Sequence, residues 1–325
     1  MDAGKNISTF FRGQKELIDF LELDERAAPY TLLETSDFPF LVPYHYAALI
    51  KKGDWRDPLL LQVLLREDEN RMKPGFVPDA VGDTASLVAP ALMHKYAGRV
   101  LLIASRRCAI HCRYCLRRSF PFDSVPVSEK EWGDARSYIQ NHSSIREIIL
   151  SGGDPLMLGN NQIVSLLETI LAMPHIRTVR IHTRVPGVWP ERIDRALLYL
   201  LKRCNDSKRV IIVIHTNHVN ELSSACKDAI RTLRDTGAVL LNQSVLLRGI
   251  NDSAETLAEL CLALVEIGVL PYYLHQLDRV CGAAHFEVNE KEGAAIIDKL
   301  RCLVPGYAVP RYVRELAGAG CKVAL

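Results

Sequence analysis

Three cysteines stand close together in this chain with the spacing C-x3-C-x2-C, at Cys108, Cys112 and Cys115. A loop with this spacing brings three thiolates close enough to hold three irons of a cubane [4Fe-4S] cluster, which leaves the fourth iron without a protein ligand. An open iron can bind and activate a substrate or cofactor, as the open position of a catalytic zinc does. The spacing therefore predicts a reactive iron-sulfur centre held by these three cysteines.

A structural zinc site is the alternative explanation for the same three cysteines. Zinc in such a site usually takes four ligands, arranged as two close pairs on separate segments. His111 could be a fourth ligand, but it lies inside the first spacer and would strain the loop. The other six cysteines are scattered singly, at Cys204, Cys226, Cys261, Cys281, Cys302 and Cys321, and we expect them to be packing residues. The zinc interpretation stays open beside the cluster interpretation.

The composition bounds the class of protein. A chain of 325 residues with 48% hydrophobic residues can bury one large core or two smaller ones. A formal net charge of +2 creates no global basic field, so no nucleic acid partner is expected. No apolar run is long enough for a signal peptide or a membrane span. Nine cysteines, an odd number, fit a reducing compartment, and we expect a soluble cytoplasmic protein.

The hydrophobic pattern changes near residue 98. Residues 1–97 are expected to form a mainly helical extension, with helical apolar spacing at 44–51 and 58–65. Short β-rich runs then alternate with helix-length stretches, which implies parallel βαβ units. Strands are expected at 100–104, 147–150, 178–183, 209–215, 238–247 and 269–275, and helices at 128–142, 162–172, 191–203, 220–236 and 254–267.

A doubly wound sheet and a barrel both fit this alternation. The chemically informative residues come just after successive strands, or within the fifth, and barrel enzymes build their sites at the carboxyl ends of their strands. This favours an α/β fold with an open (β/α)6 barrel at 98–280, and a C-terminal segment at 281–325 that closes one end. The residues in question are Cys108, Gly152, Gly153, Asp154, His182, Arg184, His215, Gln243 and Asp278.

Ser151, Gly152, Gly153 and Asp154 follow the second expected strand. Two glycines let the backbone approach a ligand closely, and their strand edge can hydrogen-bond an α-amino group. Taken alone, a strand-to-helix turn with Asp154 as the N-cap explains the same residues. With the strand directly after the C-x3-C-x2-C loop, they resemble the GGD motif of the radical S-adenosylmethionine (SAM) enzymes, which holds the methionyl amine of SAM.

Cations flank these motifs. Arginine suits two-point binding of a carboxylate or phosphate, so Arg117 is expected to face the reaction centre and bind a substrate carboxylate, whereas Arg118 is expected on a solvated face. Lys95 and Arg99, four residues apart, could bind a phosphate. Lys322, in a loop of small residues, could form a Schiff base with pyridoxal phosphate (PLP). A solvated C-terminal lysine is the alternative, and spacing does not decide between the two.

Longer blocks carry a more specific resemblance. From about residue 56 to the end, RDPLLLQVL, CRYCLRR, SGGDPLM, LLNQSVLLRGIND, PYYLHQLD and CGAAHF are similar to the lysine 2,3-aminomutases. The similarity is greatest to the branch that makes (R)-β-lysine for the modification of elongation factor P. The resemblance implies a partial TIM-type barrel and an isomerase that converts L-lysine to (R)-β-lysine, with a [4Fe-4S] cluster, SAM and PLP.

The resemblance also implies roles for single residues. The cluster is expected on Cys108, Cys112 and Cys115, and the SAM site on Ser151, Gly152, Gly153, Asp154, His215 and Gln243. The PLP phosphate is expected on Lys95 and Arg99 with help from Arg113, and the covalent PLP link on Lys322. Arg117 is expected to bind the substrate carboxylate, and Asp278 and Glu315 its distal amine. Implied partners are a flavodoxin-like or ferredoxin-like electron donor, elongation factor P with its lysyl ligase, and further copies of the chain in a homo-oligomer.

The chain departs from the family pattern at several positions. Lys95 stands where the free-lysine enzymes have arginine, and Glu315 replaces an aspartate. The sequence around Lys322 also differs, and the chain stops three residues later, which affects the Lys322 role most. Two other functions stay open: a radical SAM enzyme without PLP that acts on another amino acid or a peptide, and a non-catalytic iron-sulfur or zinc-binding interaction protein.

Overall fold

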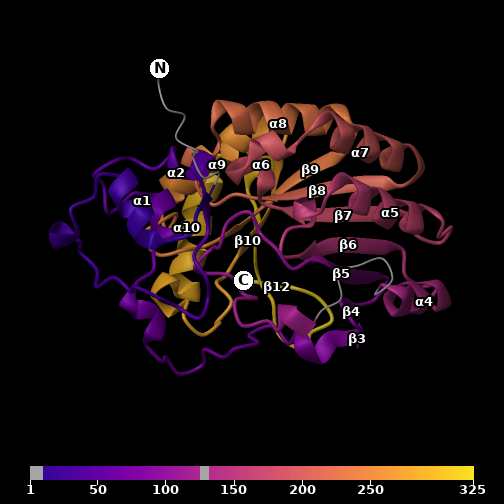
Figure 1. Cartoon of the computed structure of the whole chain (residues 1–325), viewed down its shortest axis with the longest axis horizontal. Helices are drawn as coiled ribbons and strands as arrows, with labels where there is room; N and C mark the ends of the chain where they lie inside the picture. The colour runs from indigo at the N-terminus through magenta and orange to yellow at the C-terminus, as the bar shows by residue number, and fades with distance from the viewer. Residues whose placement is uncertain (1–9, 125–131) are drawn as a thin grey trace, which may run out of the picture.

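A ten-stranded, mostly parallel sheet forms the centre of the protein, seen in a computed structural model that describes residues 10–124 and 132–325 (Figure 1). Each strand from β5 to β10 is parallel to the next in the chain, so that β5 to β11 form one parallel run. These strands are β5 (Arg99–Ser105), β6 (Glu147–Gly152), β7 (Thr178–Thr183), β8 (Arg209–His215), β9 (Val239–Val245), β10 (Leu270–His275) and β11 (Arg311–Arg314). The α/β fold class and the six expected strands are confirmed, with β7 and β8 at the expected bounds.

The sheet stays open, because its two outermost strands, β3 and β12, are not paired with each other. Helices connect the parallel strands and lie along the outer side of the sheet, where Figure 1 shows α5, α7 and α8. They are α4 (Gly133–Asn141), α5 (Asn160–Leu171), α7 (Arg195–Ser207), α8 (Ser224–Asp235) and α9 (Ala254–Glu266), with the four-residue α6 (Val185–Val188) after β7. The first part of the expected helix at 128–142, residues 128–131, lies outside the described residues.

Side chains alternate along the strands between two environments. On β9, Leu240, Asn242 and Ser244 are buried, whereas Leu241 and Gln243 are partly exposed. This period of two is that of a strand with one face against a packed layer. The inner face of a closed TIM barrel is filled by bulky apolar side chains. Here the partly exposed, open face carries polar side chains beside apolar ones such as Leu241; the polar ones are Arg180, His182, His215, Gln243 and His275.

The segment before residue 98 contains short helices, as expected, but also strands. The helices are α1 (Gln14–Phe20), α2 (Tyr44–Ala47) and α3 (Pro58–Leu61), and a small two-stranded sheet pairs β1 (Phe10–Phe11) with β2 (Val42–Pro43). The sequence pattern of this segment did not indicate these strands. β3 (Leu87–Ala89) and β4 (Leu92–Tyr96) form a hairpin that pairs with β5. β4 pairs with the edge of β5 that faces away from β6. Lys95, which belongs to β4, is therefore part of the main sheet.

The C-terminal segment extends the opposite edge of the sheet. Helix α10 (Glu290–Leu303) packs on α9, β11 pairs with β10, and the short β12 (Val323–Ala324) runs antiparallel to β11. Lys322 comes directly before β12 and is therefore fixed beside the sheet. Among the described residues, no helix has both the length and the apolar character needed to cross a membrane.

Candidate active site

The cysteine loop follows β5 at the carboxyl end of the sheet. Cys108, Cys112 and Cys115 are free thiols and partly buried. Burial, together with the other cysteines, raises the pKa of Cys108 well above its usual value and that of Cys115 to about 11. In the described residues, no three His, Cys, Asp or Glu side chains form a ready site for a single metal ion. A cubane cluster binds each thiolate to a different iron, and three clustered thiols are the donor set that such a cluster requires.

Two glycines at the end of β6 make close backbone contacts: Gly152, its last residue, packs against β5, and Gly153 packs against the start of the cysteine loop. The backbone N–H of Gly153 donates to the carbonyl of Ser105 at 2.7 Å, and that of Asp154 donates to Arg107 at 2.8 Å. A Cβ atom on Gly153 would lie 2.4 Å from the Arg107 oxygen, and one on Gly152 would lie 2.6 Å from Ile103. The close approach that requires glycine is therefore made to β5 at Gly152 and to the start of the cysteine loop at Gly153.

Asp154 joins the ends of neighbouring strands. Its buried carboxylate accepts hydrogen bonds from the hydroxyl of Thr183 at 2.9 Å and the backbone N–H of Arg184 at 2.7 Å. It also caps the short helix after β6 through the N–H of Leu156. Asp154 is thus the expected N-cap. Its hydrogen bonds to Thr183 and Arg184 also fix the position of the end of β7 relative to the cysteine loop.

His215 and Gln243 lie beside the cysteine loop. The Nε2 of His215 is 2.8 Å from the hydroxyl of Tyr114, a loop residue, and its Nδ1 is 3.0 Å from the backbone oxygen of Gln243. Burial and the nearby Arg184 lower the pKa of His215 to about 4, so the ring is neutral at physiological pH. The structure thus brings together the cysteines, the GGD segment and these two residues, which the sequence assigned to one site.

Next to the loop, partly buried cations and acids form an ion cluster around the buried Asp83. Asp83 accepts hydrogen bonds from Lys95 at 2.5 Å and from Arg117 at 2.6 Å. Glu315 accepts hydrogen bonds from Lys95 at 3.0 Å and from Lys322. Arg117 also reaches the hydroxyl of Ser151 at 3.4 Å, which links this ion cluster to the GGD segment. Residues 83, 95, 117, 315 and 322 therefore meet in one place.

Two acids of this region have opposite pKa shifts. Burial and the neighbouring Glu315 raise the pKa of Asp278 to about 7. Burial also disfavours the charged form of Glu315, but Lys322 and Lys95 outweigh it and lower the pKa of Glu315 to about 2. Pairs of acids whose environments separate their pKa values are typical of functional sites.

Arg99 lies at the start of β5, with its guanidinium 4.7 Å from the ring centre of Tyr96. Burial and Glu315 raise the pKa of Tyr96, which places this tyrosine beside the ion cluster. Within residues 10–124 and 132–325, Arg99 forms no ion pair, whereas Lys95 uses its ammonium on Val81, Asp83 and Glu315. Arg99 is therefore the more available of the two expected phosphate ligands.

Arg113 is not brought to the ion cluster, contrary to its expected role near the PLP phosphate. Its guanidinium is fully buried and donates to both carboxylate oxygens of Glu69, to the carbonyls of Phe38 and Pro39, and to the hydroxyl of Ser36. These contacts use all five of its N–H groups. Arg113 instead ties the cysteine loop to the N-terminal segment.

Three residues near the site had no predicted role. Asp83 lies in an irregular loop, where a buried acid has no sequence signal. Arg184 contacts Cys112, and only its position after a strand pointed to it. His182 is the third: its Nε2 is buried without a hydrogen-bond partner among the described residues, and burial with the charges of Arg180 and Lys322 keeps its pKa well below the usual value. A neutral, unpartnered imidazole on the open face fits a site that receives a polar cofactor.

Comparison with known proteins agrees with this geometry. The Radical SAM superfamily matches residues 102–261. The chain is 44% identical over 288 residues to the L-lysine 2,3-aminomutase of Escherichia coli (strain K12), covering 89% of this chain and 83% of that protein. It is 40% identical over 304 residues to the enzyme of that name from Haemophilus influenzae, covering 94% and 89%. For Clostridium subterminale the identity is 36% over 285 residues, covering 87% and 67%.

Among solved structures, a radical SAM methyltransferase from Sphaerobacter thermophilus aligns with a TM-score of 0.43 and 18% identity, over 68% of each chain. That likeness is too slight to carry an argument. The sequence relatives carry one, because they match nearly the whole chain at 40–44% identity. The chain therefore belongs to the lysine 2,3-aminomutase family of radical SAM enzymes, and it is an isomerase of the aminomutase type.

Proposed function

We propose that this enzyme converts L-lysine to (R)-β-lysine, with PLP as a cofactor beside the cluster and SAM. The ion cluster carries the proposal. It places a lysine, Lys322, next to a second cation and two carboxylates, within reach of the cysteine loop through Arg117 and Ser151. The relatives named L-lysine 2,3-aminomutase support lysine as the substrate.

The donor sets fit the three groups. When bound, the cluster with SAM supplies the hydrogen-abstracting chemistry, and PLP supplies the π-system across which the amino group moves. Cys108, Cys112 and Cys115 would hold the cluster. The GGD segment, His215 and Gln243 would line the SAM site. Lys322 would hold PLP covalently, and Arg99, assisted by Lys95, would bind its phosphate.

The remaining charges suit a substrate with a carboxylate at one end and an ammonium at the other. Arg117 has a guanidinium edge beyond its bond to Asp83, which can take the carboxylate with two parallel hydrogen bonds. Asp278 and Glu315 would take the distal ammonium. Fixing both ends would orient the β-carbon toward the site of hydrogen abstraction, which is how positioning accelerates such a reaction.

An anaerobic assay of the cluster-reconstituted protein tests the function. The mixture contains SAM, PLP, a chemical reductant and isotope-labelled L-lysine, and β-lysine is measured by mass spectrometry. Formation of (R)-β-lysine that requires added PLP is the expected result. Deoxyadenosine without β-lysine would instead favour a radical SAM enzyme that acts on another amino acid or a peptide.

We also propose that the product serves the modification of elongation factor P by its lysyl ligase, in the cytoplasm, and that a flavodoxin-like or ferredoxin-like protein reduces the cluster. The resemblance to that branch of the family supports this step. In bacteria that lack their own aminomutase of this type, expression of this chain should restore the β-lysyl mass increment of elongation factor P. A cluster-free triple Cys→Ala variant is the control. Light scattering tests the proposed homo-oligomer.

A further inference from the structure

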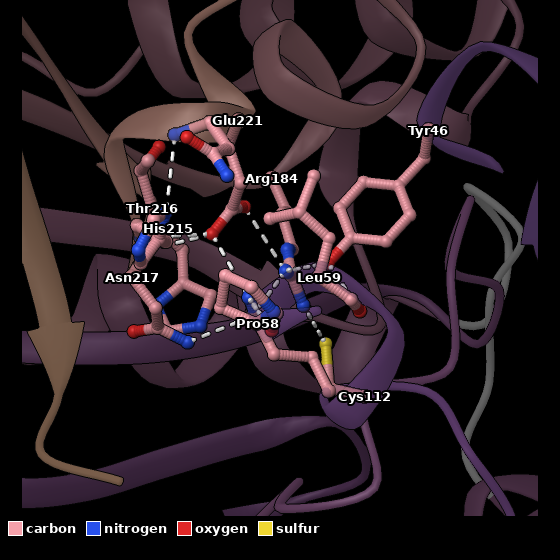
Figure 2. A network of polar contacts seen from close by, with 12 residues as sticks. Tyr46, Pro58, Leu59, Cys112, Arg184, His215, Thr216, Asn217 and Glu221 are labelled. Carbon is pink, nitrogen blue, oxygen red and sulfur yellow. Dashed lines mark hydrogen bonds and ion pairs between the residues drawn. The ribbon is translucent and has the colours of Figure 1, made fainter. Parts of the chain in front are cut away.

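Arg184, the residue after β7, contacts one of the three cysteines directly. Its Nη1 lies 2.6 Å from the Sγ of Cys112 and 2.8 Å from the hydroxyl of Tyr114. Its side chain is buried, and Figure 2 shows the guanidinium pointing from the end of the strand toward the sulfur. An arginine N–H is a strong donor on a group that is always charged, and the sulfur of Cys112 is its acceptor here.

A buried acid holds this arginine in place. The Nη2 of Arg184 donates to Glu221 at 3.0 Å and to the side-chain oxygen of Gln62 at 2.6 Å. Glu221 is fully buried, and it also accepts from the backbone N–H of Asn217 at 2.9 Å. The negative charge of Glu221 balances the cation, so the guanidinium reaches Cys112 without leaving an unpaired buried charge. The network in Figure 2 thus fixes the direction of one N–H toward one sulfur.

We propose that Arg184 is a positioning residue for the iron-sulfur cluster. Arg184 holds Cys112 in place as a ligand and raises the reduction potential of the bound cluster. One-electron reduction adds negative charge to the cluster, part of which resides on its cysteine sulfurs. An N–H donor at such a sulfur stabilises the reduced form more than the oxidised form, and hydrogen bonds to sulfur are among the features that set cluster potentials. This role does not depend on lysine being the substrate.

Arg118 provides a matched comparison. Its side chain is 8% exposed and that of Arg184 is 7% exposed, and each is paired with a buried glutamate, Glu69 for Arg118. Arg118 donates to the backbone oxygen of Arg113 and to Glu69. An Arg→Lys change keeps the charge at either position. At Arg184, however, a single ammonium drawn to Glu221 cannot also maintain the bond to Cys112 that the two-nitrogen fork provides.

The experiment is a redox titration of the cluster-loaded protein without PLP or lysine, followed by electron paramagnetic resonance. Wild type, Arg184→Lys and Arg118→Lys are compared after measurement of bound iron and sulfide. We expect Arg118→Lys to match wild type. At a fixed solution potential, the ratio of reduced to oxidised cluster in Arg184→Lys should fall about tenfold, which is 59 mV for a one-electron couple.

A double variant, Arg184→Met with Glu221→Gln, removes both charges of the buried ion pair. It tests the same proposal if Arg184→Lys does not fold. The same fall in reduced cluster is expected. Loss of bound iron from a variant that circular dichroism shows to be folded would also support the proposal, because Arg184 would then be needed to hold Cys112 as a ligand. Full iron content with an unchanged midpoint in either Arg184 variant would overturn the proposal.

Discussion

Lys322 donates a hydrogen bond to the carboxylate of Glu315, seven residues earlier in the chain. The other oxygen of that carboxylate accepts from Lys95, which belongs to β4 on the opposite side of the open sheet. Two edges of the sheet are thereby connected across its inner face by one acid between two cations. Lys322 is thereby held against Glu315 by charge, with its side chain partly buried.

Lys322→Ala should abolish covalent attachment of PLP. Protein incubated with PLP and desalted should lose the near-visible absorbance of bound cofactor, and β-lysine formation should fall by about 100-fold or more, because the reacting carbon is no longer fixed. The matched control is Lys299→Ala, which removes an exposed lysine paired with Glu255 on neighbouring α9. Retention of the absorbance band in Lys322→Ala would assign the cofactor link to another lysine.

The binding of lysine should depend on pH through Asp278. Its pKa, raised to about 7 by burial and by Glu315, means that the carboxyl group is neutral below pH 7 and charged above it. The ammonium of lysine stays protonated to about pH 10, so only the acid titrates in this range. We expect kcat/KM for lysine to rise as pH increases from 6 to 8.

Asp278→Asn is the test of that assignment. The amide has about the same size but cannot ionise, so kcat/KM should be low and should lose its rise between pH 6 and 8. The pH profile of SAM cleavage in the absence of lysine serves as the internal control. A variant that kept the wild-type rise would show that another group causes it.

Arg113 should contribute to the stability of the fold and not to the binding of PLP. Arg113→Lys keeps the charge but loses the paired hydrogen bonds to Glu69 and several bonds to the N-terminal segment. Hydrogen bonds to charged groups contribute about 1.5–3 kcal/mol each, so the free energy of unfolding, measured in urea, should fall by about 3 kcal/mol. The affinity for PLP should stay the same. Weaker PLP binding with unchanged stability would return Arg113 to the cofactor site.

The sequence predicted the parallel strands and the residues at their ends well, for a physical reason. β7 alternates apolar and polar residues and β8 is an apolar run, each between helical stretches, so hydrophobic periodicity alone marks them. The cysteines follow such a strand, the GGD segment and His215 lie at the ends of two others, and parallel strands bring their carboxyl ends to one edge of the sheet. Local pattern and three-dimensional position therefore coincide for these residues.

Residues whose partners are distant in the sequence could not be predicted in this way. Asp83 is 12 residues from Lys95 and 34 from Arg117, and only the folded hairpin brings the three together. Glu69 lies 44 residues from Arg113, so an arginine inside the cysteine motif was interpreted as a cofactor ligand. The β3–β4 hairpin also depends on pairing with β5, which a weak local pattern does not indicate.

Gly153→Ala should disturb the cluster site through the backbone. A Cβ atom at this position would lie 2.4 Å from the carbonyl oxygen of Arg107 and 2.9 Å from the carbonyl carbon of Arg106, both main-chain atoms next to Cys108. The cysteine loop must move to relieve this contact, at a cost of about 1–3 kcal/mol. Iron bound per chain after reconstitution should therefore fall, while Gly306→Ala, which would meet no atom within 4 Å, should bind as much iron as wild type. Full iron content in Gly153→Ala would mean that the cysteine loop adapts to the added carbon, and that the GGD segment does not fix its position.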